Sequence, residues 1–181
     1  MKKLKDFQGA LFCDRDGILI EALKIDGKPK SIDSFSEIKY CAGVEPGLER
    51  IREKMPIFMI TNQPEISRGN ISRELVDSIN LEIARKLRLT AVLMCPHDDK
   101  DGCSCRKPKA GLLKQAAEDY KIDLKQSFLV GDRWRDISCA HTGGLKAFFI
   151  DRNYDEPYPD PPFISVKDME EVADLLLLKA D

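Results

Sequence analysis

Short apolar runs rich in β-branched and aromatic residues alternate along this chain with amphipathic helical patterns, and this alternation most constrains the fold. The runs that predict strands lie at residues 10–13, 57–60, 91–94, 128–130 and 147–150. Helical patterns separate them, at residues 75–87, 111–120, 136–142 and 165–178. A repeated strand-then-helix order predicts a parallel sheet with helices on both faces. We therefore expect a three-layer α/β sandwich with a central parallel sheet.

The boundaries of the helices are also marked in the sequence. Ser72 is placed to cap the helix over 75–87, and Ser165 with Asp168 three residues later forms an acidic version of a capping box for the last helix. Residues 21–43 and the proline-rich stretch 155–162 read as loops. The length of 181 residues is typical of one domain, so we expect a single domain over 1–181 with no room for a large second one.

The charge and hydropathy of the chain exclude several classes of function. Lys and Arg total 29 against 31 Asp and Glu, which gives a net charge of −2 with the charges interspersed. Such a balance argues against a nucleic-acid or membrane surface, and no apolar run is long enough to cross a bilayer. We expect a cytoplasmic monomer. Its six cysteines should therefore be reduced or metal-bound rather than bridged.

Polar groups follow several of the predicted strands, at the edge where open parallel sheets bind ligands. They are Asp14 and Asp16, Thr61 and Asn62, and Asp132 with Asp136; the pair Arg106-Lys107 precedes the helix over 111–120. Each group alone has an ordinary alternative: a solvated turn, a helix cap or a surface charge run. Paired carboxylates with a nearby glycine nevertheless favour a cation, and the hydroxyl and cations favour phosphate oxygens.

A second pattern predicts a zinc site. Cys95 and His97 form one closely spaced pair of ligands, Cys103 and Cys105 form another, and a polar loop joins the two pairs. Three thiolates and one imidazole complete a closed tetrahedral site, which is typical of structural rather than catalytic zinc. The zinc loop, residues 95–105, runs directly into Arg106, so the metal would hold Arg106 and Lys107 in place.

Taken together, the motifs Asp14-Arg15-Asp16-Gly17, Thr61-Asn62-Gln63, Arg106-Lys107-Pro108 and Gly131-Asp132 resemble those of the haloacid dehalogenase superfamily of phosphohydrolases. The zinc loop followed by Arg-Lys-Pro is similar to the subgroup that contains heptose bisphosphate phosphatases and histidinol phosphatases. The resemblance covers residues 7–150. It implies a Rossmann-like fold without a large cap domain.

The resemblance also implies a magnesium-dependent mechanism. Asp14 would attack phosphorus to form an aspartyl phosphate, and Asp16 would act as general acid and then general base. Mg²⁺ would be held by Asp14, the main-chain carbonyl of Asp16 and Asp132, with Asp136 either a supporting carboxylate or an outer metal contact. Thr61, Asn62 and Lys107 would bind the transferred phosphate, and Arg106 would reach the rest of the substrate.

The expected substrate is a phosphorylated sugar, with heptose 1,7-bisphosphate hydrolysed at the 7-position as the main hypothesis. A second phosphate needs cations, which Arg106 with Lys109 or Arg68 could supply. A histidinol-phosphate phosphatase is the nearest alternative, because Glu65 and Asp98 could instead bind a cationic amine. A third hypothesis, from another class, is a zinc-stabilised binding module without catalysis.

Overall fold

The computed structural model describes residues 8–178, and its centre is a six-stranded sheet. The strand order is β5-β4-β1-β6-β7-β8 and every pair is parallel, as predicted. The strands are Leu11–Cys13 (β1), Ile57–Asn62 (β4), Ala91–Cys95 (β5), Phe128–Gly131 (β6), Lys146–Phe149 (β7) and Ile164–Ser165 (β8). The first strand in the chain therefore lies inside the sheet, between β4 and β6.

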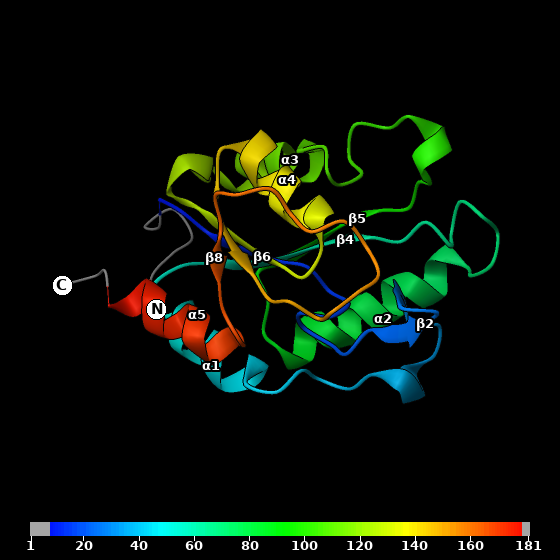
Figure 1. The fold of residues 1–181 in the computed structure, drawn as a ribbon, viewed down its shortest axis with the longest axis horizontal. Helices are drawn as coiled ribbons and strands as arrows, with labels where there is room; N and C mark the ends of the chain where they lie inside the picture. The colour runs from blue at the N-terminus through cyan, green and yellow to red at the C-terminus, as the bar shows by residue number, and fades with distance from the viewer. Residues whose placement is uncertain (1–7, 179–181) are drawn as a thin grey trace.

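Helices cover both faces of this sheet, so the predicted three layers are confirmed (Figure 1). One face carries α1, α2 and α5, and the other carries α3 and α4. Their bounds are Val44–Arg52 (α1), Arg73–Lys86 (α2), Gly111–Tyr120 (α3), Trp134–Gly143 (α4) and Met169–Leu177 (α5), and short 3-10 helices lie at Phe35–Glu37, Asp99–Asp101 and Leu124–Gln126.

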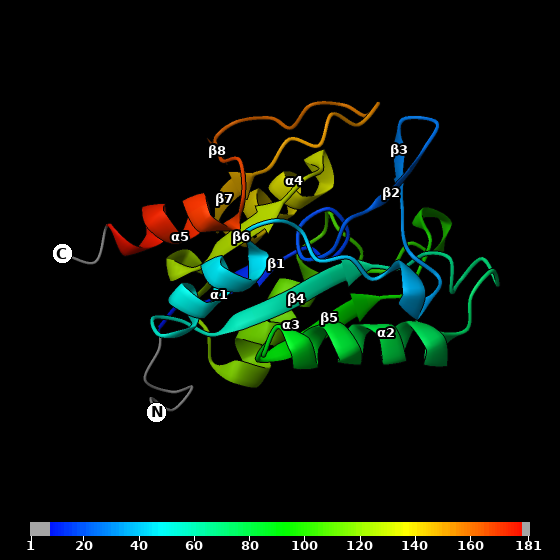
Figure 2. The same ribbon diagram turned by 90° about the horizontal axis from the view of Figure 1, so that it is seen from below.

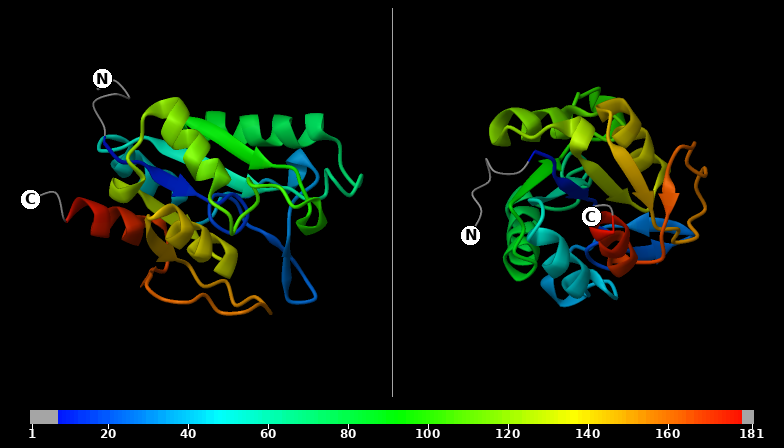
Figure 3. Two further views of the ribbon diagram at one scale, coloured as in Figure 1. Left: turned by 90° about the horizontal axis from the view of Figure 1, so that it is seen from above. Right: turned by 90° about the vertical axis from the view of Figure 1, so that its left-hand side faces the viewer.

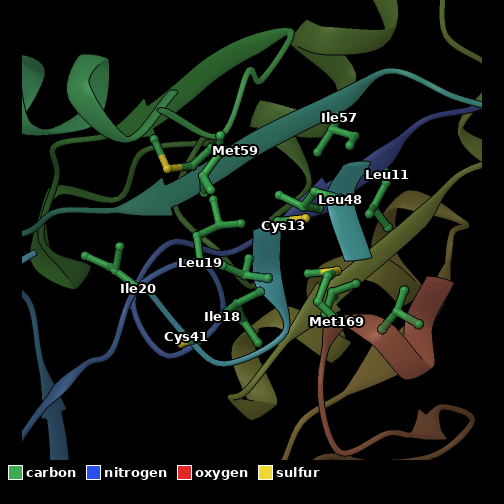
Figure 4. Packing of buried hydrophobic residues seen from close by; sticks show 14 of the residues in the cluster. Leu11, Cys13, Ile18, Leu19, Ile20, Cys41, Leu48, Ile57, Met59 and Met169 are labelled. Carbon is green, nitrogen blue, oxygen red and sulfur yellow. The ribbon is translucent and has the colours of Figure 1, made fainter. Parts of the chain in front are cut away.

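Alternate residues of the buried strands feed two separate hydrophobic clusters, because successive side chains of a strand point to opposite faces. Leu11 and Cys13 of β1 pack in one cluster with Met59, Leu48 and Met169 (Figure 4). Phe12 of β1 points to the other cluster. There its ring stacks on Phe58 with the centroids 5.2 Å apart. β1 is thus buried on both sides, which fixes the position of the Asp14 that follows it.

The carboxyl ends of the strands point to one edge, and the segments with the polar motifs gather there (Figures 2 and 3). Two antiparallel strands, Leu23–Ile25 (β2) and Lys28–Lys30 (β3), form a hairpin outside the main sheet at the same edge. Residues 21–43 were predicted as a loop, and that prediction was wrong for the hairpin and the 3-10 helix. The hairpin is mostly exposed and each of its strands has only three residues, which is too short for a periodicity signal.

Other differences from the predicted elements are local. The predictions did not include α1 and β8. The last helix begins at Met169 rather than near Ser165: Asp168 is the N-cap and accepts a hydrogen bond of 2.9 Å from the Glu171 backbone N–H. Ser165 instead belongs to β8. Ser72, by contrast, caps α2 as predicted, with its side chain accepting from the Leu75 N–H.

Within residues 8–178, none of the helices combines the length and apolar character needed to cross a bilayer.

Candidate active site

Three buried carboxylates surround the ammonium group of Lys107. Lys107 Nζ lies 2.7 Å from Asp14 Oδ1 and 2.7 Å from Asp136 Oδ1, and it donates to the Ile60 carbonyl at 3.1 Å. Asp132 completes the group: one carboxylate oxygen from each of Asp14, Asp132 and Asp136 lies within 4.8 Å of the other two. Residues from the ends of β1 and β6, from the first turn of α4 and from the segment before α3 therefore meet at one point.

Burial controls the ionisation of this carboxylate cluster. Removal from water raises the pKa of Asp14 to about 6, with the positive charge of Lys107 opposing the rise and Asp136 adding to it. Burial, and then the charges of Asp14 and Asp136, raise the pKa of Asp132 well above its ordinary value. Burial lowers the pKa of Lys107, but the two carboxylates more than offset this effect and keep the ammonium charged.

The same cluster fits a divalent cation. One ammonium group leaves two negative charges of the three ionised carboxylates uncompensated. Moreover, Asp132 Oδ1 is buried and accepts no hydrogen bond from any of residues 8–178, while Asp132 Oδ2 accepts one from the Tyr154 hydroxyl at 2.8 Å. A buried carboxylate oxygen without a partner is costly unless a cation binds it. An all-oxygen site of this kind suits Mg²⁺.

Two glycines allow the carboxylates to approach. Gly17 has φ of +86°, and a Cβ there would lie 1.7 Å from Asp132 Oδ2. A Cβ at Gly131 would lie 2.1 Å from the Cβ of Asp136. Asp136 itself has both oxygens engaged, since Oδ1 contacts Lys107 and Oδ2 accepts from the Arg133 N–H at 3.1 Å at the start of α4. Asp136 thus supports Lys107 from within the cluster.

Asp16 lies outside this cluster, and its carboxylate is held by a different set of donors. Arg15, which is 0% exposed, donates from Nε to Asp16 Oδ2 and from Nη2 to Oδ1, both at 3.1 Å. Ser31 Oγ and Gln63 Nε2 also donate to Oδ2, each at 3.0 Å. The Asp16 side chain is therefore free of the cation site and available for proton transfer.

The two predicted phosphate-binding residues of β4, Thr61 and Asn62, make different side-chain contacts. Asn62 uses its side chain on the backbone of Lys107, donating to the carbonyl and accepting from the N–H, each at 3.1 Å. This reciprocal pair ties the end of β4 to Lys107. Thr61 is 1% exposed and its hydroxyl accepts a 2.8 Å hydrogen bond from Gln63 Nε2. Asn62 lines the active-site cavity, whereas Thr61 does not.

The four predicted zinc ligands are brought together. The sulfur of Cys95 lies 3.6 Å from that of Cys103 and 3.2 Å from that of Cys105, and His97 Nδ1 lies 3.3 Å from the Cys105 sulfur. These separations are too long for a disulfide. Ligands about 2.0 to 2.3 Å from a tetrahedral zinc ion would lie about 3.5 to 3.8 Å apart, close to the spacing of this thiol and imidazole cluster.

The loop that carries this cluster also holds Arg106. The Arg106 guanidinium donates to the His97 carbonyl at 3.1 Å and to Asp99 Oδ1 at 2.8 Å. Arg135 of α4 donates to the same Asp99 carboxylate at 3.2 Å. Two arginines are therefore held side by side on one carboxylate. Lys109 donates to the carbonyls of Gly102 and Cys103 and so points into the loop.

A small cavity of about 40 Å³ lies over the carboxylates and shares residues with a larger one of about 490 Å³. The shared residues are Pro29, Lys30, Ser31, Asn62, Arg133 and Arg135. The larger cavity is basic, with six cationic residues, Lys28, Lys30, Arg68, Arg106, Arg133 and Arg135, against the acidic Glu65, Asp99 and Glu156. The hairpin β2–β3 thus forms part of the rim of both.

Four residues of the site were missed by the sequence predictions: Arg15, Gln63, Asn80 and Tyr154. Asn80 accepts a 2.8 Å hydrogen bond from Arg15 Nη1, at the far end of the guanidinium from Asp16. Asn80 stands on the buried face of α2 beside apolar residues, and a polar residue on such a face was the available signal. Tyr154 lies in a segment without a motif, so no sequence signal indicated its contact with Asp132.

Several known proteins are similar to this chain in sequence. A family model described as HAD-hydrolase-like matches residues 104–161. The chain is 36% identical over 145 residues to the histidine biosynthesis bifunctional protein HisB of Actinobacillus pleuropneumoniae, covering 77% of this chain but only 39% of that protein. It is 35% identical over 151 residues to D-glycero-beta-D-manno-heptose-1,7-bisphosphate 7-phosphatase of Haemophilus ducreyi, covering 76% of this chain and 79% of that enzyme.

A solved structure of a protein with a related name has a similar fold. D,D-heptose 1,7-bisphosphate phosphatase from B. bronchiseptica, complexed with magnesium and phosphate, matches with a TM-score of 0.82 and 25% identity. The match covers 95% of this chain and 99% of that one. The predicted fold class is therefore confirmed. The shared fold, with sequence identity over most of the length of several relatives, shows that the chain belongs to the haloacid dehalogenase-like hydrolase family that contains the heptose-1,7-bisphosphate 7-phosphatases.

Proposed function

We propose that the protein is a magnesium-dependent phosphoric monoester hydrolase that removes the 7-phosphate of D-glycero-D-manno-heptose 1,7-bisphosphate. The observation that carries this proposal is the buried contact of Asp14 with Lys107 beside the partnerless oxygen of Asp132. A nucleophilic carboxylate, a fixed cation and an open cation site are the parts that phosphoryl transfer needs. The names of the relatives support the choice of substrate.

In the proposed reaction an Asp14 carboxylate oxygen attacks phosphorus in line with the sugar oxygen. The P–O bond to the sugar breaks, and Asp16 gives its proton to the departing oxygen. Water then attacks the aspartyl phosphate and transfers a proton to Asp16, which restores the acid and releases inorganic phosphate. Lys107, with its pKa held above the ordinary value by Asp136 and Asp14 despite burial, faces the non-bridging oxygens. Asn62 lines the pocket beside it.

The proposal assigns two metals to two clusters. Asp14, Asp132 and the main-chain carbonyl of Asp16 would hold Mg²⁺, with Asp136 behind them, and the ion would neutralise charge on the transferred phosphoryl group. Cys95, His97, Cys103 and Cys105 would hold Zn²⁺ as a structural ion that keeps Arg106 and Lys107 in place. The spacing of the thiol and imidazole cluster supports this second assignment. Reduced thiols also fit the cytoplasm as the compartment.

The basic cavity favours a bisphosphate over histidinol phosphate. Of the two carboxylates considered for binding an amine, Glu65 lines the cavity and pairs with Arg68, whereas Asp98, which also pairs with Arg68, lies outside the cavity lining. Arg106 and Arg135 share Asp99 and so retain positive charge toward the cavity. A second phosphate is the ligand that such a pair binds well. Lys109, the other cation considered for this role, lies outside the cavity lining.

A binding module without catalysis would not need the buried charges of the carboxylate cluster, which are costly to fold without a chemical role. The proposal treats residues 1–181 as one catalytic domain with the inserted zinc loop. It also treats the protein as a monomer whose partner is the phosphorylated sugar.

The decisive measurement is the ratio of kcat/KM for heptose 1,7-bisphosphate to that for histidinol phosphate, with Mg²⁺ present. We expect the ratio to exceed one, and Arg106→Ala or Arg135→Ala to lower it by raising KM for the bisphosphate. Arg50→Ala is the control, because Arg50 pairs with Asp174 on the surface of α1 and lies outside the cavity. A ratio below one would favour histidinol phosphate as the substrate. If the protein hydrolysed no phosphate monoester in the presence of Mg²⁺, the proposed function would be rejected.

A further inference from the structure

The guanidinium of Arg15 is completely buried, and the reaction proposed above gives it no part. Burying a charge is costly unless charged or polar partners satisfy it. Arg15 has such partners at both ends: two of its nitrogens donate to the two oxygens of Asp16, and the third donates to Asn80 Oδ1 at 2.8 Å. The side chain therefore spans the gap between the Asp16 carboxylate and helix α2.

Asn80 is an unusual residue for its position. It is 3% exposed and stands on the face of α2 that otherwise buries Val76, Ile79 and Ile83. Among the described residues 8–178, its amide nitrogen makes a single long contact, of 3.5 Å, with the Met94 sulfur. The strong bond of Asn80 is thus the one that its oxygen accepts from Arg15, and α2 supplies a fixed anchor for the guanidinium.

The two oxygens of Asp16 differ in how many donors reach them. Oδ2 accepts hydrogen bonds from Arg15 Nε, Ser31 Oγ and Gln63 Nε2, which exhausts its lone pairs. From residues 8–178, Oδ1 accepts a single hydrogen bond, from Arg15 Nη2 at 3.1 Å, and the same nitrogen also lies 3.1 Å from Oδ2. A proton on Asp16 therefore has room on Oδ1 and not on Oδ2. Arg15 Nε, Ser31 and Gln63, which all donate to Oδ2, fix which of the two oxygens this is.

We propose that Arg15 and Asn80 are positioning residues that hold the Asp16 carboxyl so that Oδ1 carries the transferred proton. The inference rests on the proposed function and deepens it. When the P–O bond breaks, the proton on Asp16 Oδ1 passes to the departing sugar oxygen, and Oδ1 later takes a proton from the attacking water. Arg15 gains and loses no proton, and Asn80 acts only through Arg15.

The proposal predicts a dependence on the leaving group. A sugar alkoxide must be protonated as it departs, so its rate depends on a well-aligned Asp16. A nitrophenolate leaves without being protonated, so the hydrolysis rate of an aryl phosphate does not depend on the alignment of Asp16. kcat/KM reports the steps up to the first departure and excludes the later hydrolysis of the aspartyl phosphate. Loss of alignment should therefore lower kcat/KM for the sugar bisphosphate and spare that for p-nitrophenyl phosphate.

The test compares Asn80→Leu and Arg15→Lys with the wild-type protein on both substrates. Asn80→Leu removes the acceptor oxygen at similar volume, and Arg15→Lys keeps the charge but removes the fork. We expect kcat/KM for the sugar bisphosphate to fall about 10- to 100-fold, with a change of less than about threefold for the aryl phosphate. Asn80→Asp retains the acceptor oxygen and should stay close to wild type.

Val76→Ala is the matched control, because Val76 is buried on the same face of α2 and makes no contact with Arg15 through a polar atom. It should lower the unfolding temperature without changing the ratio of the two kcat/KM values. Equal losses on both substrates in Asn80→Leu and Arg15→Lys, no loss on either, or the same selective loss in Val76→Ala would overturn the inference. If the wild-type protein hydrolyses neither substrate, the proposed function itself fails and the inference falls with it.

Discussion

At the scale of single residues, the two aspartates of the first motif, Asp14 and Asp16, have different side-chain partners. Asp14 contacts Lys107 and faces two further carboxylates, whereas the Asp16 side chain is turned to Arg15, Ser31 and Gln63. The motif predicted that both residues lie at one site, but spacing alone could not show that their side chains diverge. The division of roles comes from the partners that the rest of the fold supplies.

Substitution of the nucleophile gives the first prediction at this scale. Asp14→Asn keeps the shape of the side chain but cannot form the phosphoenzyme, so we expect turnover to vanish while the far-ultraviolet circular dichroism is retained. Asp16→Asn should retain a residual rate, reduced by about 10² to 10⁴. Turnover in Asp14→Asn, measured on protein shown by mass spectrometry to be free of deamidation, would contradict the assignment of Asp14.

At the residue scale the sequence patterns predicted the convergence of groups that follow strands or that precede or begin helices. They anticipated that Asp14, Lys107, Asp132 and Asp136 converge, and that Cys95 and its three partners cluster. They could not anticipate Asn80 or Tyr154, because their roles depend on which distant side chain each one meets. Arg15 shows the same limit: a charged residue between two aspartates gives no sign that it will be buried.

At the scale of elements, the order of the strands explains why these groups meet. β1 lies between β4 and β6, so Asp14 and Asp132 follow neighbouring strands, and β4 brings Asn62 to the backbone of Lys107. The alternation of strand and helix patterns was sufficient to predict five of its six parallel strands, but not β8. The hairpin β2–β3 escaped prediction because its stability comes from its surroundings. Asp155 N–H donates to the Gly27 carbonyl at 2.8 Å, and Lys24 donates to the Asn153 carbonyl at 2.6 Å.

The thiol and imidazole cluster provides a prediction for one element. Removal of zinc, or Cys103→Ser, should speed backbone amide exchange over residues 95–109 and lower activity, because the loop would lose the ion that closes it. Hydrogen exchange read by mass spectrometry is the measurement, and α5, far from the loop, is the internal reference. Native protein without zinc in metal analysis, or Cys103→Ser with unchanged exchange, would refute the zinc assignment.

At the scale of the whole molecule, stability should depend on the carboxylate cluster, pH and magnesium together. Without metal, the pKa of Asp14 is about 6 instead of 3.8, so the folded state binds a proton that the unfolded state releases between these values. Stability from this group is therefore greatest below pH 3.8, declines as pH rises from there through about 6, and levels off above that. Mg²⁺ needs the deprotonated carboxylates, so its stabilisation should have the opposite dependence.

We therefore expect Mg²⁺ to raise the unfolding temperature little at pH 5 and more at pH 7.5, as measured by differential scanning fluorimetry. Asp132→Asn should remove this increase in unfolding temperature, because it removes the carboxylate whose Oδ1 has no hydrogen-bond partner among residues 8–178. The exposed carboxylate substitution Asp174→Asn is the control and should leave the increase unchanged. A magnesium effect of equal size at both pH values would contradict the coupling.

The hairpin β2–β3 is a part of the molecule in which substitutions can change substrate specificity. It contributes Lys28, Pro29 and Lys30 to the cavity lining but no member of the carboxylate cluster, and it hangs outside the main sheet. Mutations in it can change which molecule fits while the machinery that cleaves the ester bond stays intact. Members of a family with this arrangement can change substrate through substitutions in a small exposed hairpin, while the catalytic residues and the activity are retained.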